Sequence, residues 1–171
     1  MGDKTLIPWR EVANWGCRAC GNCCIGYRVP LRMDEFVKVG NACGQGVFEY
    51  GMGKVYLRNG PDRRCVLQRP LMDRWICTVQ GLKPTACRLF PFRIQNKPVY
   101  PRGDNSSYKL GDKTYYIYLD SACEGIILGQ PTQRFATQVL PEILRNGLGN
   151  AQKQKYSTSK YISWIPPWSF Q

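Results

Sequence analysis

Two stretches of the chain have the spacing of amphipathic helices. Residues 32–44, RMDEFVKVGNACG, predict a short helix with Asp34 as its cap and one of two glycines near its end, and Phe36 and Val37 should face the core. Residues 132–147 form the longest helical pattern, which ends at a glycine and carries one apolar stripe. Pro141 lies inside this second pattern and should kink or divide the helix, because proline cannot donate a helical hydrogen bond.

Most other apolar runs are short and favour strands. Residues 47–59 give β-type runs separated by glycines, and residues 63–79 give two strands joined by a turn, with Cys65 on one arm and Cys77 on the other. Residues 113–119, KTYYIYL, read as a strand that Cys123 follows. Between these strands, LKPTACRLFPF predicts a brief helical turn bounded by two prolines.

This pattern predicts a small α+β fold: a loop-rich, metal-stapled domain with short β-hairpins and a few short helices over 1–148, followed by a basic, aromatic tail over 149–171. No apolar run approaches the roughly 18 residues of a membrane helix. The N-terminal residues resemble neither a signal peptide nor a myristoylation site, so we expect a cytoplasmic protein without a transmembrane segment.

Nine cysteines and no histidine give the chain its most distinctive chemistry. In a reducing compartment, so many thiols favour metal binding over disulfides. The stretch CRACGNCC places Cys17, Cys20 and Cys23 at the three-residue spacing that can hold three corners of an iron-sulfur cubane, and Gly21 allows a left-handed turn. Cys24 should point away from Cys23 if the segment is extended, which would indicate two metal centres, or one centre and a spare thiol.

Four later cysteines lie at the edges of predicted elements, where a ligand can be held rigidly, whereas Cys43 follows a helix and is left out. The motifs CRACGNCC, CTVQGLKPTACRLFPF and CEG together resemble the CxxCxxCC zinc- or iron-chelating domain family, also called YkgJ-like cysteine-cluster proteins, over roughly residues 15–128. Lys83 stands where that family usually has arginine. The resemblance implies a ligand set of eight thiols: Cys17, Cys20, Cys23, Cys24, Cys65, Cys77, Cys87 and Cys123.

Thiolate ligands suit both zinc and 4Fe-4S clusters, so the donor type does not decide the metal. The repeated spacing and the family favour one or two 4Fe-4S clusters, with zinc as the alternative. The same family includes proteins similar to flagellin lysine N-methylases, so an iron-sulfur enzyme or electron-transfer protein remains an alternative, as does a metal carrier or assembly factor. The lack of histidine removes the commonest general base and nucleophile pairs, and we predict no catalytic residue.

The charge of the chain favours a polyanionic partner. Its formal net charge is +12, and two segments without acids, between Asp73 and Asp104 and after Glu142, hold ten of its cations. We therefore expect a basic module associated with RNA or a ribonucleoprotein, in which the metal is mainly structural. The aromatic tail could also anchor a protein partner. The predicted nucleic-acid contacts are Arg74, Lys83, Arg88, Arg93, Lys97, Arg102, Lys153, Lys155, Lys160 and Trp164.

Overall fold

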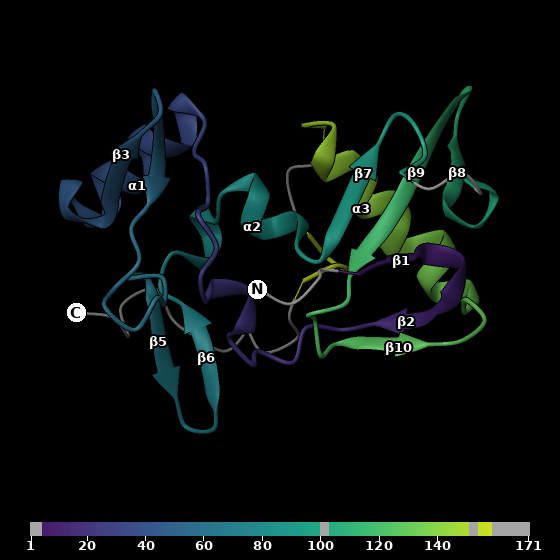
Figure 1. Cartoon of the computed structure of the whole chain (residues 1–171), viewed down its shortest axis with the longest axis horizontal. Helices are drawn as coiled ribbons and strands as arrows, with labels where there is room; N and C mark the ends of the chain where they lie inside the picture. Colours follow the sequence, from purple (N-terminus) through teal and green to yellow (C-terminus); the bar gives the residue numbers. More distant parts are fainter. Residues whose placement is uncertain (1–4, 100–102, 151–153, 159–171) are drawn as a thin grey trace. The chain divides into compact units, whose positions relative to one another are not determined.

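The computed structural model describes residues 5–99, 103–150 and 154–158. These residues form two compact units, which Figure 1 shows as ribbons. The first unit combines residues 5–18 with 89–158, and the second consists of residues 19–88. Among the described residues, no helix has both the length and the apolar character needed to cross a membrane.

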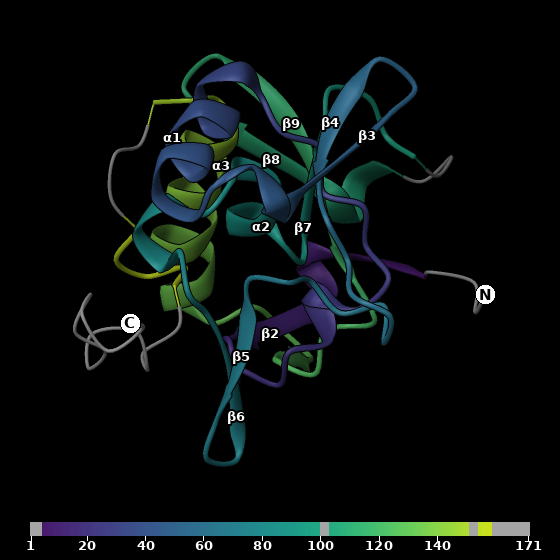
Figure 2. The ribbon, with the colours of Figure 1, turned by 90° about the vertical axis from the view of Figure 1, so that its left-hand side faces the viewer.

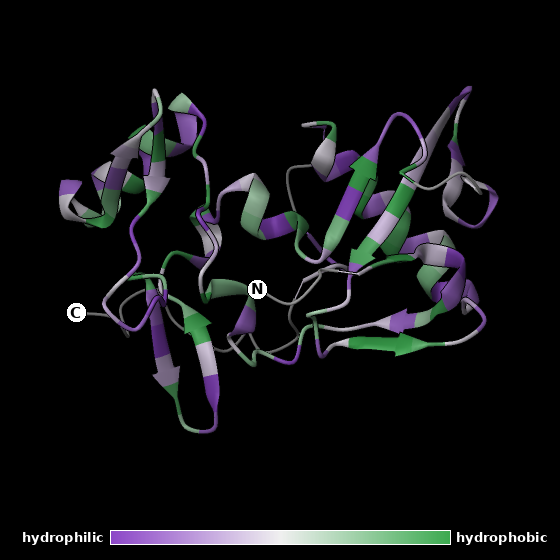
Figure 3. Cartoon of the chain, in the orientation of Figure 1, coloured by the Kyte–Doolittle hydropathy of each residue, from purple (hydrophilic) through white to green (hydrophobic). Residues whose placement is uncertain are grey.

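The first unit is built on an antiparallel sheet whose central strand is β9 (Lys113–Asp120). Strands β1 (Leu6–Pro8), β7 (Phe92–Gln95) and β8 (Ser107–Leu110) all pair with β9. Alternate side chains of β9 enter the core, so Ile117 and Leu119 are fully buried. Figure 3 shows apolar bands alternating with hydrophilic ones along β7. This arrangement confirms the strand predicted over 113–119.

A second strand pair and a helical segment complete the first unit. Strand β2 (Val12–Trp15) pairs with β10 (Ile126–Leu128), and short 3-10 turns η1 (Trp9–Glu11) and η5 (Gly103–Ser106) lie in the connecting chain. The helical segment consists of a π-helical turn, η6 (Phe135–Val139), and helix α3 (Leu140–Gly147). Phe135, Val139, Leu140, Ile143 and Leu144 from this segment are all fully buried.

Pro141 divides this helical segment, as predicted. The ring nitrogen of a proline has no hydrogen to donate to the carbonyl four residues earlier, and the helix widens just before it. The Leu140 N–H accordingly donates to the carbonyl of Phe135, five residues back. At the other end of α3, the chain packs closely, because a Cβ on Gly147 would lie 2.5 Å from the Ile94 side chain.

The second unit contains two hairpins and two helices. Strands β3 (Phe48–Gly51) and β4 (Lys54–Leu57) form one hairpin, and β5 (Gln68–Leu71) and β6 (Arg74–Cys77) form the other, which Figure 2 shows as separate ribbons. Helix α1 (Met33–Cys43) and the brief helix α2 (Thr85–Leu89) accompany them. Three 3-10 turns link these elements: η2 (Asn22–Cys24), η3 (Gln45–Val47) and η4 (Gln80–Leu82).

The α+β fold class is therefore confirmed, while several details of the second unit differ from the prediction. Helix α1 ends against Gly44, but Arg32 is its cap residue rather than Asp34, because the Glu35 carboxylate reaches back to the Arg32 N–H. Phe36 packs against the core, whereas Val37 is 51% exposed. Cys65 lies three residues before β5 rather than on it. The predicted boundary between 148 and 149 stays a prediction.

Candidate metal centre

The CxxCxxCC segment contains two left-handed residues ahead of its cysteine doublet. Ala19 has φ +56° and Gly21 has φ +82°, and the chain then enters turn η2. The left-handed conformation costs free energy in any residue that has a Cβ. This cost explains why a glycine follows the second cysteine of the motif. The left-handed turn predicted at Gly21 is confirmed.

The β5–β6 hairpin and the residues before it bind this loop through hydrogen bonds. The Trp75 N–H donates to the Ala19 carbonyl at 2.8 Å, and the buried Gln68 side-chain amide donates to the Gly21 carbonyl at 3.2 Å. The guanidinium of Arg64 lies 3.7 Å from the Trp75 ring centroid and donates to the Gln68 side chain at 2.6 Å. These supporting residues could not be predicted, since arginine, glutamine and tryptophan at these spacings carry no metal signal.

The cysteine doublet lies on a helical turn, not in an extended segment. Because Cys23 and Cys24 belong to η2, their side chains do not point to opposite sides, and their sulfur atoms are 3.8 Å apart. The expectation based on an extended segment is therefore wrong for this pair. Both thiols belong to the same cluster.

Three more thiols from the second unit join the doublet. Cys65 precedes β5 and is buried, Cys77 ends β6, and Cys87 lies in α2. Cys24, Cys77 and Cys87 pack against the apolar core of the second unit, of which Cys65 is a member. We call Cys23, Cys24, Cys65, Cys77 and Cys87 the thiol cluster.

The thiols of this cluster influence one another electrostatically. Burial raises the pKa of Cys87, and negative charge on Cys77, Cys65 or Cys23 raises it further. The pKa values of Cys65 and Cys77 are also raised, first by burial and then by other thiolates of the cluster. Because thiolates repel one another, the ionisation of several cluster thiols at once is unfavourable in the metal-free chain. A bound cation would offset this repulsion.

Cys23 is the exception, since its pKa is lowered to about 6. The main cause is the hydrogen bond from the Cys24 thiol, which stabilises the Cys23 thiolate; burial opposes this effect, and the positive charge of Lys83 adds to it. The pKa of Cys24 is correspondingly raised, because its proton is held by Cys23 and its surroundings are buried. The doublet thus behaves as a thiolate and thiol pair.

Lys83 lies close enough to the thiol cluster for its charge to matter at three positions. It lowers the pKa values of Cys23, Cys77 and Cys87, against burial at each of them. A cation beside a group of thiolates compensates part of their negative charge. Lys83 is a predicted nucleic-acid contact, and its charge also acts on these thiols.

Cys17 and Cys123 lie in the first unit. Both pack against its apolar core, and the indole N–H of Trp15 donates to the Cys123 sulfur at 3.4 Å. The β2–β10 pairing extends to a hydrogen bond from the Gly16 N–H to the Gly125 carbonyl at 3.1 Å.

The two remaining cysteines belong to the second unit. Cys20 lies in the loop before Gly21 and is half-buried. Cys43, which the sequence analysis left out, ends α1 and packs against the core that holds the thiol cluster. Its charge raises the pKa of Cys77, after the larger effect of burial. Only the long-range packing of α1 brings Cys43 here, so its sequence context gave no signal.

The donor chemistry of the cluster fits a soft metal. In the described part of the chain, no three Cys, Asp or Glu side chains surround one point in a way that could hold an ion. Thiolates without histidine or carboxylate partners suit zinc and iron-sulfur clusters.

The predicted nucleic-acid residues are spread over both units. Arg93, Lys97 and Lys155 are exposed in the first unit, although Arg93 also lies 3.6 Å from the buried Asp120 carboxylate. In the second unit, Arg74 and Arg88 are half-buried. The other predicted contacts lie outside the described residues: Arg102, Lys153, Lys160 and Trp164.

A cluster of buried and half-buried thiols on a small α+β scaffold is typical of a cysteine-cluster metal-binding protein. Residues 16–124 match the CxxCxxCC family, described as "Putative zinc- or iron-chelating domain", and the chain belongs to this family. Comparison with curated proteins gives no match, and comparison with solved structures gives none either. The family description supports metal binding by the cysteine cluster and names both zinc and iron.

The lowered pKa of Cys23 predicts selective alkylation of the metal-free, reduced protein. The modification rate of Cys23 by iodoacetamide should rise through about pH 6 and then level off, because the thiolate is the nucleophile. An ordinary thiol would reach this point near pH 8.5. Mass spectrometry of the modified peptides gives the rate at each cysteine.

The variant Cys24→Ala removes the thiol that donates to Cys23 and should move the Cys23 midpoint upward by at least about one pH unit. Cys43→Ala, which changes a thiol outside the thiol cluster, is the control and should leave the midpoint in place. A Cys23 midpoint near that of an ordinary thiol in the unsubstituted chain would contradict this assignment.

Proposed function

We propose that the thiol cluster of the second unit holds a 4Fe-4S cluster, with zinc as the alternative. The supporting observation is that five cysteines come from separate stretches of the chain: Cys23 and Cys24 in η2, Cys65 before β5, Cys77 at the end of β6 and Cys87 in α2. Four of them belong to or pack against one apolar core, and the sulfur of Cys23 lies 3.8 Å from that of Cys24. Four thiolates complete either kind of site. The C-x-x-C-x-x-C spacing is typical of iron-sulfur proteins and favours the first kind, although only Cys23 of these three cysteines belongs to the thiol cluster. Because the thiol cluster has five cysteines and the site needs four, one thiol is left over that can replace a bound one.

The metal is mainly structural in this proposal. The second unit consists of four-residue strands and two short helices, which bury little apolar surface by themselves. A site that ties the loop, the hairpin and α2 together adds its binding free energy to folding.

Anaerobic purification followed by iron, sulfide and zinc analysis tests the proposal. We expect about four iron and four sulfide per occupied site, together with broad visible absorption that dithionite bleaches. Tightly held zinc without iron would select the alternative. A protein that takes up neither metal, even after reconstitution under reducing conditions, would refute the proposal.

A second candidate function is association with RNA. Its support is the exposed cations of the first unit, Arg93, Lys97 and Lys155, in a chain whose formal net charge is +12. Binding to a single-stranded RNA oligonucleotide should weaken steeply between about 50 and 200 mM salt. Lys97→Glu should weaken it at all salt concentrations, while equal binding by the two proteins would argue against this surface.

A further inference from the structure

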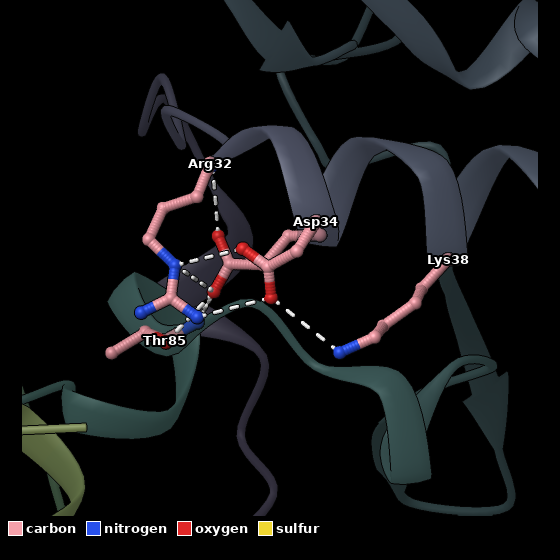
Figure 4. Close-up of polar contacts among 5 residues, drawn as sticks. Arg32, Asp34, Lys38 and Thr85 are labelled. Carbon is pink, nitrogen blue, oxygen red and sulfur yellow. Dashed lines mark hydrogen bonds and ion pairs between the residues drawn. The ribbon is translucent and has the colours of Figure 1, made fainter.

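One buried carboxylate connects the starts of the two helices of the second unit. Glu35, in the first turn of α1, is 7% exposed. One of its oxygens accepts the Arg32 N–H at 3.0 Å. The other accepts both the N–H and the hydroxyl of Thr85 at 2.7 Å, and Figure 4 shows Arg32 and Thr85 in this arrangement.

Thr85 is the first residue of α2, and Cys87 lies two residues further on. A helix of five residues cannot hold its own conformation, because one turn gives too few hydrogen bonds to offset the cost of nucleation. The free N–H groups at its start need acceptors, and Glu35 supplies one from an element 50 residues earlier in the sequence. The position of Cys87 therefore depends on Glu35.

We propose that Glu35 is a positioning residue, which holds Cys87 in the thiol cluster without binding the metal itself. The proposal rests on the proposed metal-binding function. The pKa of Glu35 is lowered, since the hydrogen bonds from Arg32 and Thr85 outweigh the opposing effect of burial, so the group is a carboxylate at neutral pH. An ionised acceptor makes stronger hydrogen bonds than a neutral one.

The other acid at this end of α1 has a different role and provides a matched control. Asp34 pairs with Arg32 at 3.1 Å and with Lys38 at 3.4 Å, and its side chain is 48% exposed. Exposed pairs of this kind contribute little to stability. Asp34→Asn therefore removes one negative charge from the same turn of α1 without changing the link to α2.

The test compares Glu35→Gln, Thr85→Val, Thr85→Ser and Asp34→Asn in the full chain. Each protein is loaded with Zn²⁺, and alkylation of each cysteine is followed by mass spectrometry. Glu35→Gln and Thr85→Val should raise the modification rate at Cys87 by about tenfold relative to Cys65, because each loses a hydrogen bond to a charged group. Thr85→Ser, which keeps both donors, and Asp34→Asn should resemble the unsubstituted chain.

Co²⁺ gives an independent measurement, since its visible spectrum reports the number of thiolate ligands. Glu35→Gln should weaken the sulfur-to-cobalt band. A uniform rise in modification at all cluster cysteines would indicate general loosening and overturn the proposal, as would no change at Cys87. If the unsubstituted chain binds no metal, the proposed function fails, while the same comparison on the metal-free chain still tests whether Glu35 positions Cys87.

Discussion

Gly21→Ala is expected to weaken metal binding strongly. An alanine Cβ would lie 2.7 Å from Cβ and Cγ of Trp75 and 2.9 Å from the Arg64 guanidinium, and the residue would also have to adopt φ +82°. The left-handed conformation costs a residue with a Cβ about 1–2 kcal/mol, and overpacking adds typically 1–3 kcal/mol. The loop would move away from Trp75 and Arg64, and Cys20 and Cys23 would move with it.

The measurement is zinc and iron content after purification, combined with a Zn²⁺ titration in competition with a chelator. A loss of about 2–5 kcal/mol corresponds to a weakening of the metal affinity by at least about thirtyfold. Gly46→Ala in the same unit is the matched control, because its Cβ would meet nothing within 4 Å and its φ is not in the left-handed region. Equal metal binding by the two variants would show that the loop does not need its left-handed turn.

The residues that the sequence could predict at this site are those whose chemistry or backbone conformation is local. Thiols are the donor type of a metal site, and a glycine after the second cysteine indicates a left-handed turn, so Cys20, Gly21 and Cys23 were found without any tertiary information. Helix α2 was predicted as well, because prolines at both ends of LKPTACRLFPF restrict the chain on either side of Cys87.

The supporting residues could not be predicted, because their roles depend on contacts between distant parts of the chain. Gln68 is 47 residues from the Gly21 carbonyl that it binds, and Glu35 is 50 residues from Thr85. In the sequence, a glutamine in a strand and a glutamate in the first turn of a helix have ordinary local explanations. The prediction that Cys23 and Cys24 point apart was wrong for a related reason. It assumed an extended segment, whereas the loop held by Gln68 and Trp75 continues into a 3-10 turn at these two residues.

Gly125→Ala is expected to cause the largest loss of stability in the first unit. Gly125 belongs to the CEG motif, and its Cα faces the carbonyl of Gly16 so closely that an added Cβ would collide with that oxygen. The Gly16 carbonyl is backbone, so neither side can yield by rotating a side chain. The β2–β10 pair would have to open at this point, which would displace Trp15 and the Cys123 sulfur that its indole contacts.

We expect a decrease of roughly 2–3 kcal/mol in the free energy of unfolding, measured by urea titration with tryptophan fluorescence. Alkylation of Cys123 should become faster in the folded protein, because the Trp15 contact is lost. Gly16→Ala places the same methyl group on the opposite strand of the same pair, where it would meet nothing within 4 Å, and should change neither quantity. If both substitutions lower stability equally, then added bulk on either strand, rather than the close approach at Gly125, accounts for the loss.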